Sequence, residues 1–191
     1  MRTISFPMLL VAVVLASLVG CASQPDRVAI ESKAEITPDA AKLRLFGMNG
    51  NLVMLYRNSD CIGGGEKVQV SGEMGQMLSS LFGVVKNESI GMTETHNSKN
   101  VVDLGGFGHS AFYKEYALNP GKPVAIEMSF KEIGGKYCFP KTFTFVPEQN
   151  AEYEGLVQVD FDKGACYYIL KRISKNGEVM PFETHYASAC H

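Results

Sequence analysis

The chain has 191 residues, of which 46% are hydrophobic and 20% charged, and its formal net charge at pH 7 is −2. This length suits a single domain that buries a core of its own. Lysine and arginine form no cluster along the sequence, which removes the electrostatic basis for nucleic-acid binding.

The N-terminus is predicted to be an export signal. Arg2 supplies one positive charge, a mostly apolar run covers residues 4–19, and Gly20 and Cys21 follow. The run is shorter than the roughly 20 apolar residues that a transmembrane helix needs. A charge, an apolar stretch and a small residue in this order are typical of a cleaved secretory signal. We therefore expect a signal peptide over residues 1–20.

The tetrapeptide Leu18-Val19-Gly20-Cys21 resembles the lipobox of bacterial lipoproteins. The resemblance implies that diacylglycerol alkylates the Cys21 thiol, that cleavage follows Gly20, and that the new amine is acylated, with palmitate as an expected acyl group. About two or three acyl chains would then anchor the protein stably. Ala22, rather than Asp, follows the cysteine, which by the sorting rule of enteric bacteria implies the outer membrane, facing the periplasm. The expected partners are the membrane, through this anchor, and an envelope protein; the sequence indicates no cofactor.

Four cysteines remain once Cys21 is set aside: Cys61, Cys138, Cys166 and Cys190. An even number in an exported chain predicts two disulfides. A metal site is the alternative. It is disfavoured because no Cys-x-x-Cys spacing occurs, and because only Cys190 has histidines, His185 and His191, close in sequence.

A hairpin near the C-terminus suggests how these cysteines pair. Asn176-Gly177 is typical of a two-residue turn, and it separates expected strands over residues 166–173 and 179–186. In that register the start of the first strand lies opposite the end of the second, which brings the outer cysteines together. We therefore predict the pairs Cys166–Cys190 and Cys61–Cys138.

Residues 21–41 are polar and contain two prolines, so we expect a lipidated tether before a single domain over residues 42–191. Asn49-Gly50 predicts a hairpin between the first two strands of that domain. Pro181 cannot donate to a ladder, which places the last strand at an edge or at a bulge. The domain is predicted to be mainly β, an antiparallel β-sandwich or small barrel. Its expected strands cover residues 42–46, 52–57, 124–130, 142–146, 157–161, 166–173 and 179–186.

The middle of the chain differs from this pattern. Residues 73–86 carry apolar side chains at helical spacing, which predicts one short helix packed on a sheet. Contact with a membrane or a partner is the alternative for this helix. The next stretch, residues 87–108, is polar and rich in glycine. A loop of this length is expected to be functional or mobile.

Catalytic candidates are few. Gly63-Gly64-Gly65 lacks the lysine and hydroxyl residue of a phosphate-binding loop, so a flexible turn is the better interpretation. His96 and His109 could serve a hydrolase if an acid such as Asp103 or Glu115 lay beside them. Solvated loop residues are the simpler interpretation, because the sequence supplies no nucleophile in a recognisable elbow.

Aromatic residues gather at 112–116 and at Tyr167-Tyr168. In a sandwich some of them should enter the core, which leaves the others free to line a groove. The strand and turn pattern around Pro120-Gly121 and residues 145–148 resembles the small β-rich lipoproteins of Gram-negative envelopes. The resemblance implies a non-enzymatic binding or scaffolding role and transfers no catalytic residue. A carrier of a small apolar ligand, or a hydrolase using His109 or His96, is the alternative.

Overall fold

The structure is a computed structural model that describes residues 37–48, 50–72, 86–105, 110–131, 137–160, 163 and 165–191. Cys21 and the expected signal peptide lie outside the described residues. The same holds for His109 and for all but the last residue of the expected helix over residues 73–86.

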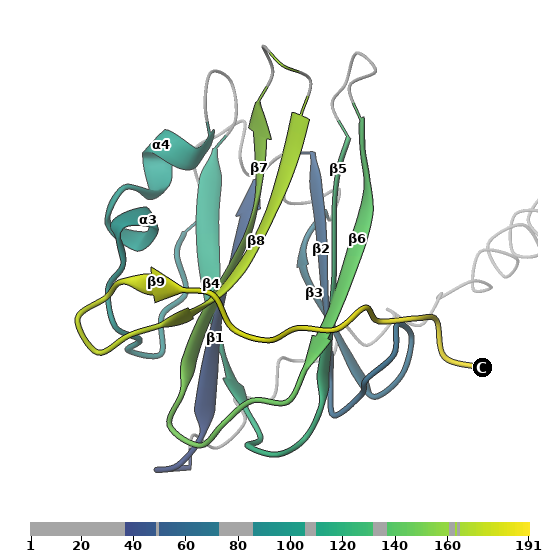
Figure 1. Cartoon of the computed structure of the whole chain (residues 1–191). Helices are drawn as coiled ribbons and strands as arrows, with labels where there is room; N and C mark the ends of the chain where they lie inside the picture. Colours follow the sequence, from purple (N-terminus) through teal and green to yellow (C-terminus); the bar gives the residue numbers. More distant parts are fainter. Residues whose placement is uncertain are drawn as a thin grey trace, which may run out of the picture. The chain divides into compact units, whose positions relative to one another are not determined.

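The described strands form two sheets that face each other, so the expected β-sandwich is confirmed (Figure 1). One sheet has the order β4 (Ala111–Leu118), β1 (Ala41–Met48), β7 (Glu152–Asp160), β8 (Ala165–Ile173) and β9 (Val179–Met180). The other has the order β3 (Glu66–Ser71), β2 (Asn51–Arg57), β5 (Val124–Lys131) and β6 (Tyr137–Phe145). Strands β1 and β7 run parallel, whereas every other pair is antiparallel.

The core lies between the two sheets and follows from alternation along the strands. Leu43 and Leu45 of β1 face Ile126 and Met128 of β5 across this space, and all four are fully buried. Gly155 lies close against the core, where an added Cβ would lie 2.7 Å from the Cε atom of Met128. A larger residue at this position would force core side chains apart.

The expected hairpin between the first two strands is wrong. Strand β1 pairs with β4 on one side and β7 on the other, whereas β2 pairs with β3 and β5. The chain instead passes from one sheet to the other at Gly50, which has φ 87° and whose carbonyl accepts a hydrogen bond from the Lys131 N–H. The apolar sides of β1 and β2 therefore meet across the core, not side by side in one sheet.

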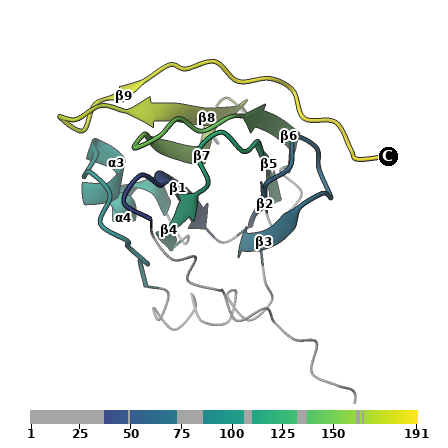
Figure 2. The same cartoon turned by 90° about the horizontal axis from the view of Figure 1, so that it is seen from below.

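The C-terminal hairpin is shorter than expected and has another register. Only Val179 and Met180 pair with β8, opposite Ile173 and Arg172, so residues 174–178 connect the paired residues in place of the two-residue turn that we expected. Pro181 then ends the ladder, because it has no N–H to donate. The C-terminal tail (residues 181–191) leaves this sheet and crosses to the other one (Figures 1 and 2).

Phe182, His185 and Ala189 help to fasten the C-terminal tail to the rest of the sandwich. The Phe182 ring packs against Phe145 and Tyr153, with centroid distances of 5.2 and 4.9 Å. Farther along, His185 forms a bridge with Thr144 of β6, and Ala189 forms one with Ile62. This path carries Cys190 away from β8 and toward the loop after β2.

The four cysteines form two disulfides, as expected, but the predicted pairs are wrong. Cys61 bonds to Cys190, and Cys138 bonds to Cys166. The prediction assumed that the last strand continues beside β8 to residue 186, whereas Pro181 diverts the chain. Cys138 on β6 and Cys166 on β8 thus come together across the edge of the sandwich, and their bond joins the two sheets.

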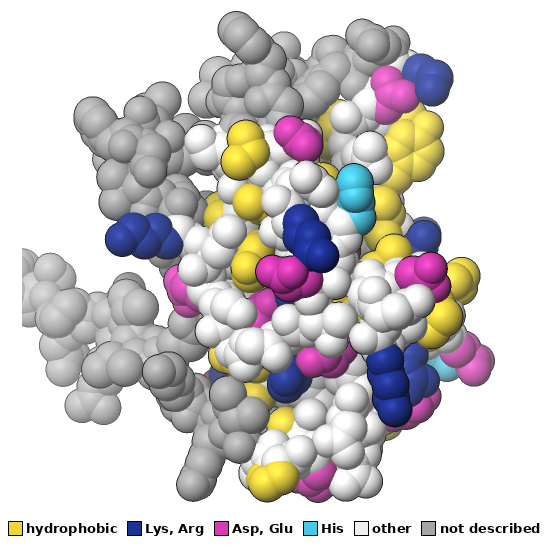
Figure 3. Space-filling model, turned by 90° about the vertical axis from the view of Figure 1, so that its left-hand side faces the viewer, with side chains coloured by type: hydrophobic (Ala, Val, Ile, Leu, Met, Phe, Trp, Pro, Cys, Tyr) yellow, Lys and Arg dark blue, Asp and Glu magenta, His cyan; other side chains and the backbone are white. Residues whose placement is uncertain are grey.

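Residues 86–95, named here the covering loop, lie over the outer face of β4, β1 and β7. The loop leads into two short helices, α3 (His96–Lys99) and α4 (Val101–Gly105), within the stretch where the sequence suggested a long loop. Thr95 caps α3, because its side chain accepts a hydrogen bond from the Ser98 N–H while the Ser98 side chain accepts one from the Thr95 N–H. Figure 3 views this side of the molecule, where basic and acidic side chains are interspersed.

Candidate functional site

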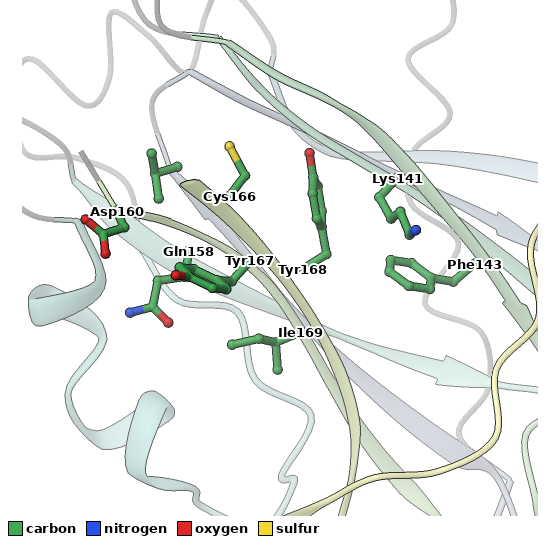
Figure 4. Close-up of a pocket in the computed structure, with 9 residues that line it drawn as sticks. Lys141, Phe143, Gln158, Asp160, Cys166, Tyr167, Tyr168 and Ile169 are labelled. Carbon is green, nitrogen blue, oxygen red and sulfur yellow. The ribbon is translucent and has the colours of Figure 1, made fainter. Parts of the chain in front are cut away.

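The candidate site is a groove along the edge of the sandwich where β6 and β8 lie close together, named here the flank groove. Its volume is about 950 Å³, it is open to solvent, and strands β6, β7 and β8 line it. The lining residues are Lys141, Phe143, Gln158, Val159, Asp160, Cys166, Tyr167, Tyr168 and Ile169 (Figure 4). Small-molecule sites in proteins usually occupy roughly 300–1,000 Å³ and are largely apolar.

Both faces of β8 contribute side chains to the flank groove, because successive residues of a strand point in opposite directions. Cys166 and Tyr168 pack against the core, as do Phe143 and Val159. In Figure 4 the Tyr168 ring stands between Cys166 on one side and Lys141 and Phe143 on the other. Tyr167 lies beside Gln158, its partner in the β7–β8 ladder, and keeps 46% of its surface exposed.

Two links between the sheets hold the flank groove in shape. The disulfide between Cys138 and Cys166 joins β6 to β8. The Tyr168 hydroxyl donates a hydrogen bond to the Phe139 carbonyl oxygen, which joins the same two strands. Phe139 itself is 76% exposed, an unusual position for so large an apolar side chain. A groove fixed in this way needs little reorganisation to accept a ligand.

The two charged residues that line the flank groove, Asp160 and Lys141, differ in their ion pairing. Asp160 is paired with Lys163, whose Nζ atom lies 3.2 Å from the Asp160 Oδ2 atom. Lys141 is exposed, and no ion pair among the described residues involves it. The lining therefore combines aromatic and aliphatic side chains with one available positive charge.

A second polar cluster lies under the covering loop and consists of Arg44, Glu115 and Glu154, named here the buried charge cluster. The Arg44 guanidinium contacts Glu115 at 2.6 Å and Glu154 at 3.2 Å, and each of the three side chains is at most 2% exposed. The covering loop completes the cluster, because the Thr93 carbonyl accepts from Arg44 and the Thr95 hydroxyl donates to Glu154. The protein's own groups thus fill this site, which makes it a structural element and not a ligand site.

Glu115 is the carboxylate that fastens the covering loop most extensively. Its Oε2 atom accepts hydrogen bonds from the Ser89 hydroxyl and from the N–H groups of Ile90 and Met92. Burial by itself raises the pKa of this carboxyl, but the hydrogen bonds from Ser89, Arg44, Ile90 and Met92 outweigh burial and lower the pKa below its ordinary value of 4.5. Glu115 is therefore held in its charged form.

Of the two histidines considered for a hydrolase, the structure describes only His96. His96 is exposed on α3, where its side chain meets Asn100, and no ion pair within the described part of the chain involves it. Glu115 belongs to the buried charge cluster, and Asp103 lies on α4. Near the C-terminus, His185 lies 3.6 Å from Glu183, while the neighbouring Cys190 is committed to its disulfide.

The glycine run forms a turn, as expected. Gly63 and Gly65 have positive φ values of 95° and 59°. Gly64 lies against the Cys61–Cys190 disulfide, where an added Cβ would come within 2.7 Å of the Cys190 sulfur. Glycine is thus required here for backbone conformation and for close approach to the disulfide.

The described residues contain no group of three or more His, Cys, Asp or Glu side chains placed to hold a metal ion. None of the helices that the structure describes is long and apolar enough to cross a bilayer.

A scan against protein-family models found no match to this chain. Neither the curated proteins nor the solved structures contain a match.

Proposed function

We propose that this chain is a lipid-anchored protein of the bacterial envelope that binds another envelope component and has no enzymatic activity. The observation that carries the proposal is the use of the cysteines. Cys61, Cys138, Cys166 and Cys190 are all consumed by two disulfides. Such bonds persist in oxidising compartments such as the periplasm. Cys21 is then left over, directly behind a signal-like segment and within a lipobox-like tetrapeptide.

The flank groove supports a binding role. It is open, largely apolar and held by a disulfide, and exposed apolar surface of this kind marks interaction sites in soluble domains. It also favours the second candidate, a carrier of a small ligand. The space between the sheets is filled by core side chains, so a carried ligand would occupy the flank groove and not the interior.

Photocross-linking in intact Gram-negative cells tests the binding role. Tyr167, in the flank groove, is replaced by the photoreactive residue p-benzoylphenylalanine in the full-length chain. Val102 on α4, which is 79% exposed, receives the same replacement as the matched control. We expect a discrete adduct from position 167 and none from position 102. Equal adducts at both positions, or none at either, would contradict a binding role for the flank groove.

A variant that cannot be lipidated tests whether the association depends on the membrane anchor. In Cys21→Ser cells we expect the position 167 adduct to weaken strongly, because the anchor no longer concentrates the protein at the membrane. An adduct of unchanged yield would show that the anchor has no part in the association.

A further inference from the structure

We propose that the flank groove binds an amphipathic anion, a small molecule with an apolar body and one negatively charged head group such as a carboxylate. The inference rests on the proposed binding role and adds the chemical class of the ligand. Three properties of the flank groove carry it: apolar surface left in contact with water, one available cation, and two strand edges at the opening.

The apolar body of the ligand follows from the aromatic lining. Several aromatic side chains of the sandwich are almost completely buried, as with Phe46, Phe112 and Tyr116, which are at most 4% exposed. At the flank groove, Tyr167 remains 46% exposed, and Phe143 and Tyr168 are only partly covered. Covering such surface is favourable at about 25 cal/mol for each Å² removed from water. A ligand with an aliphatic or planar apolar body gains this energy, whereas a fully polar ligand does not.

The negative head group follows from the charges. Lys141 takes part in no ion pair among the residues that the structure describes, and in Figure 4 it lies on the same side of Tyr168 as Phe143. Asp160, the carboxylate in the lining, already pairs with Lys163. Lys141 would therefore repel a cationic ligand, and the one carboxylate in the lining is already paired. An anionic ligand, by contrast, would form an ion pair with Lys141 at the edge of the apolar surface. Such pairs contribute orientation and specificity more than affinity.

The opening of the flank groove lies at strand edges. Strand β6 is the last strand of its sheet, and β9 covers β8 only at Arg172 and Ile173. The Cys138–Cys166 disulfide lies at one end of the paired edges, and the C-terminal tail crosses β6 at Thr144. Among the described residues, the part of the edge between the disulfide and Thr144 is open, and its length limits the length of a ligand that can bind there. This geometry favours a small amphiphile over an extended polypeptide.

The test measures binding of two molecules that share one apolar body, octanoate and its uncharged amide, octanamide. The full-length protein is reconstituted in neutral phosphatidylcholine nanodiscs, and empty nanodiscs supply the blank for calorimetric titration. We expect octanoate to bind about fivefold more tightly than octanamide, the ratio that one exposed ion pair of about 1 kcal/mol provides. Equal affinities would overturn the charge preference.

Two charge-reversal variants locate the preference. Lys141→Glu should weaken octanoate binding about tenfold and leave octanamide within about twofold. Lys122→Glu makes the same change of charge on an exposed turn outside the flank groove and should affect neither ligand. Equal effects of the two variants would show that net charge, not Lys141, controls binding, and would overturn the site.

The outcomes also distinguish this inference from the proposed function. If neither molecule binds while position 167 still yields its discrete adduct in cells, the ligand class is wrong and the binding role survives. If the adduct is missing and octanoate binds as described, the anion site stands and an envelope partner at this groove does not.

Discussion

Arg44 balances two buried carboxylates at the centre of the buried charge cluster. Its side chain is 1% exposed, so Arg44→Met would leave Glu115 and Glu154 buried without a cation. Removing one partner of a buried pair usually costs about 3–5 kcal/mol, and we expect a loss of this size in the free energy of unfolding, measured by urea denaturation.

Lys42→Met is the matched control for that variant. Lys42 lies on the same strand and pairs with Glu152 at 3.2 Å, but its side chain is 25% exposed. Partly exposed pairs contribute about 1 kcal/mol or less. Equal losses in the free energy of unfolding for Arg44→Met and Lys42→Met would mean that the burial of Arg44 has no special energetic consequence.

Glu115 gives the stability of the fold a defined dependence on pH. Because its pKa is lowered in the folded protein, the unfolded chain takes up a proton first as the solution is acidified. The stabilisation is therefore complete above the ordinary value of 4.5 and is lost as the pH falls through the folded value. Urea titrations at several pH values between about 7 and 3 should show this loss.

Glu115→Gln should lower the free energy of unfolding near neutral pH and flatten its fall below pH 4.5. Glu178→Gln, at an exposed carboxylate in the last turn, should leave the pH profile unchanged. A wild-type profile that persists in the Glu115→Gln variant would refute the role assigned to this carboxylate.

The buried charge cluster could not be predicted from the sequence. Arg44 alternates with Leu43 and Leu45, and this pattern indicates a strand with one polar, solvated face. The face is buried because the covering loop, more than 40 residues later in the chain, returns to it. The sequence suggested that residues such as Tyr167 and Tyr168 could line a groove. Nothing in the sequence around Lys141 distinguishes it from other surface lysines.

At the scale of elements, the positions of most strands could be predicted from the sequence, but which strands pair with each other could not. Alternation located β1, β2, β5 and β8 to within a few residues, and it found the C-terminal halves of β6 and β7. Strand β3 was missed because its run, Glu66–Ser71, is short and polar at its start. Strand β4 was identified only as an aromatic cluster. Pairing depends on which apolar faces meet across the core, and Gly50, which belongs to a hairpin signal in the sequence, lies where the chain crosses between the sheets.

One attachment of the C-terminal tail is covalent, the disulfide between Cys61 and Cys190. The double variant Cys61→Ser/Cys190→Ser removes a bond between residues 129 positions apart. In the loop-entropy model a bond over so long a span contributes about 4–5 kcal/mol. We expect the melting temperature to fall and proteolysis to begin within the C-terminal tail, detected by limited digestion and mass spectrometry.

The double variant Cys138→Ser/Cys166→Ser is the comparison. Its bond spans only 28 positions, and its loss should cost less stability. It should also leave the C-terminal tail protected, because Phe182 and the Cys61–Cys190 bond still fasten it. Early cleavage of the tail in this variant, and not in the other, would contradict the path that the tail takes.

The whole molecule is a sandwich with both outer faces partly covered by chain segments that are not strands of the sheets. The covering loop lies over one sheet. The C-terminal tail reaches the other, where Ala187 is buried against Tyr56 and Ala125. Within the described part of the chain, the edge where β6 and β8 meet carries the flank groove.

The most direct test of this account is a non-reducing peptide map, by mass spectrometry, of the full-length chain extracted from the membranes of a Gram-negative host. The account predicts an N-terminal peptide that begins at Cys21 and carries diacylglycerol and acyl groups. It also predicts linked peptides that join Cys61 to Cys190 and Cys138 to Cys166. A peptide that runs through Gly20 into an unmodified Cys21 would contradict the anchor, and free thiols at the other four cysteines would contradict an oxidising location.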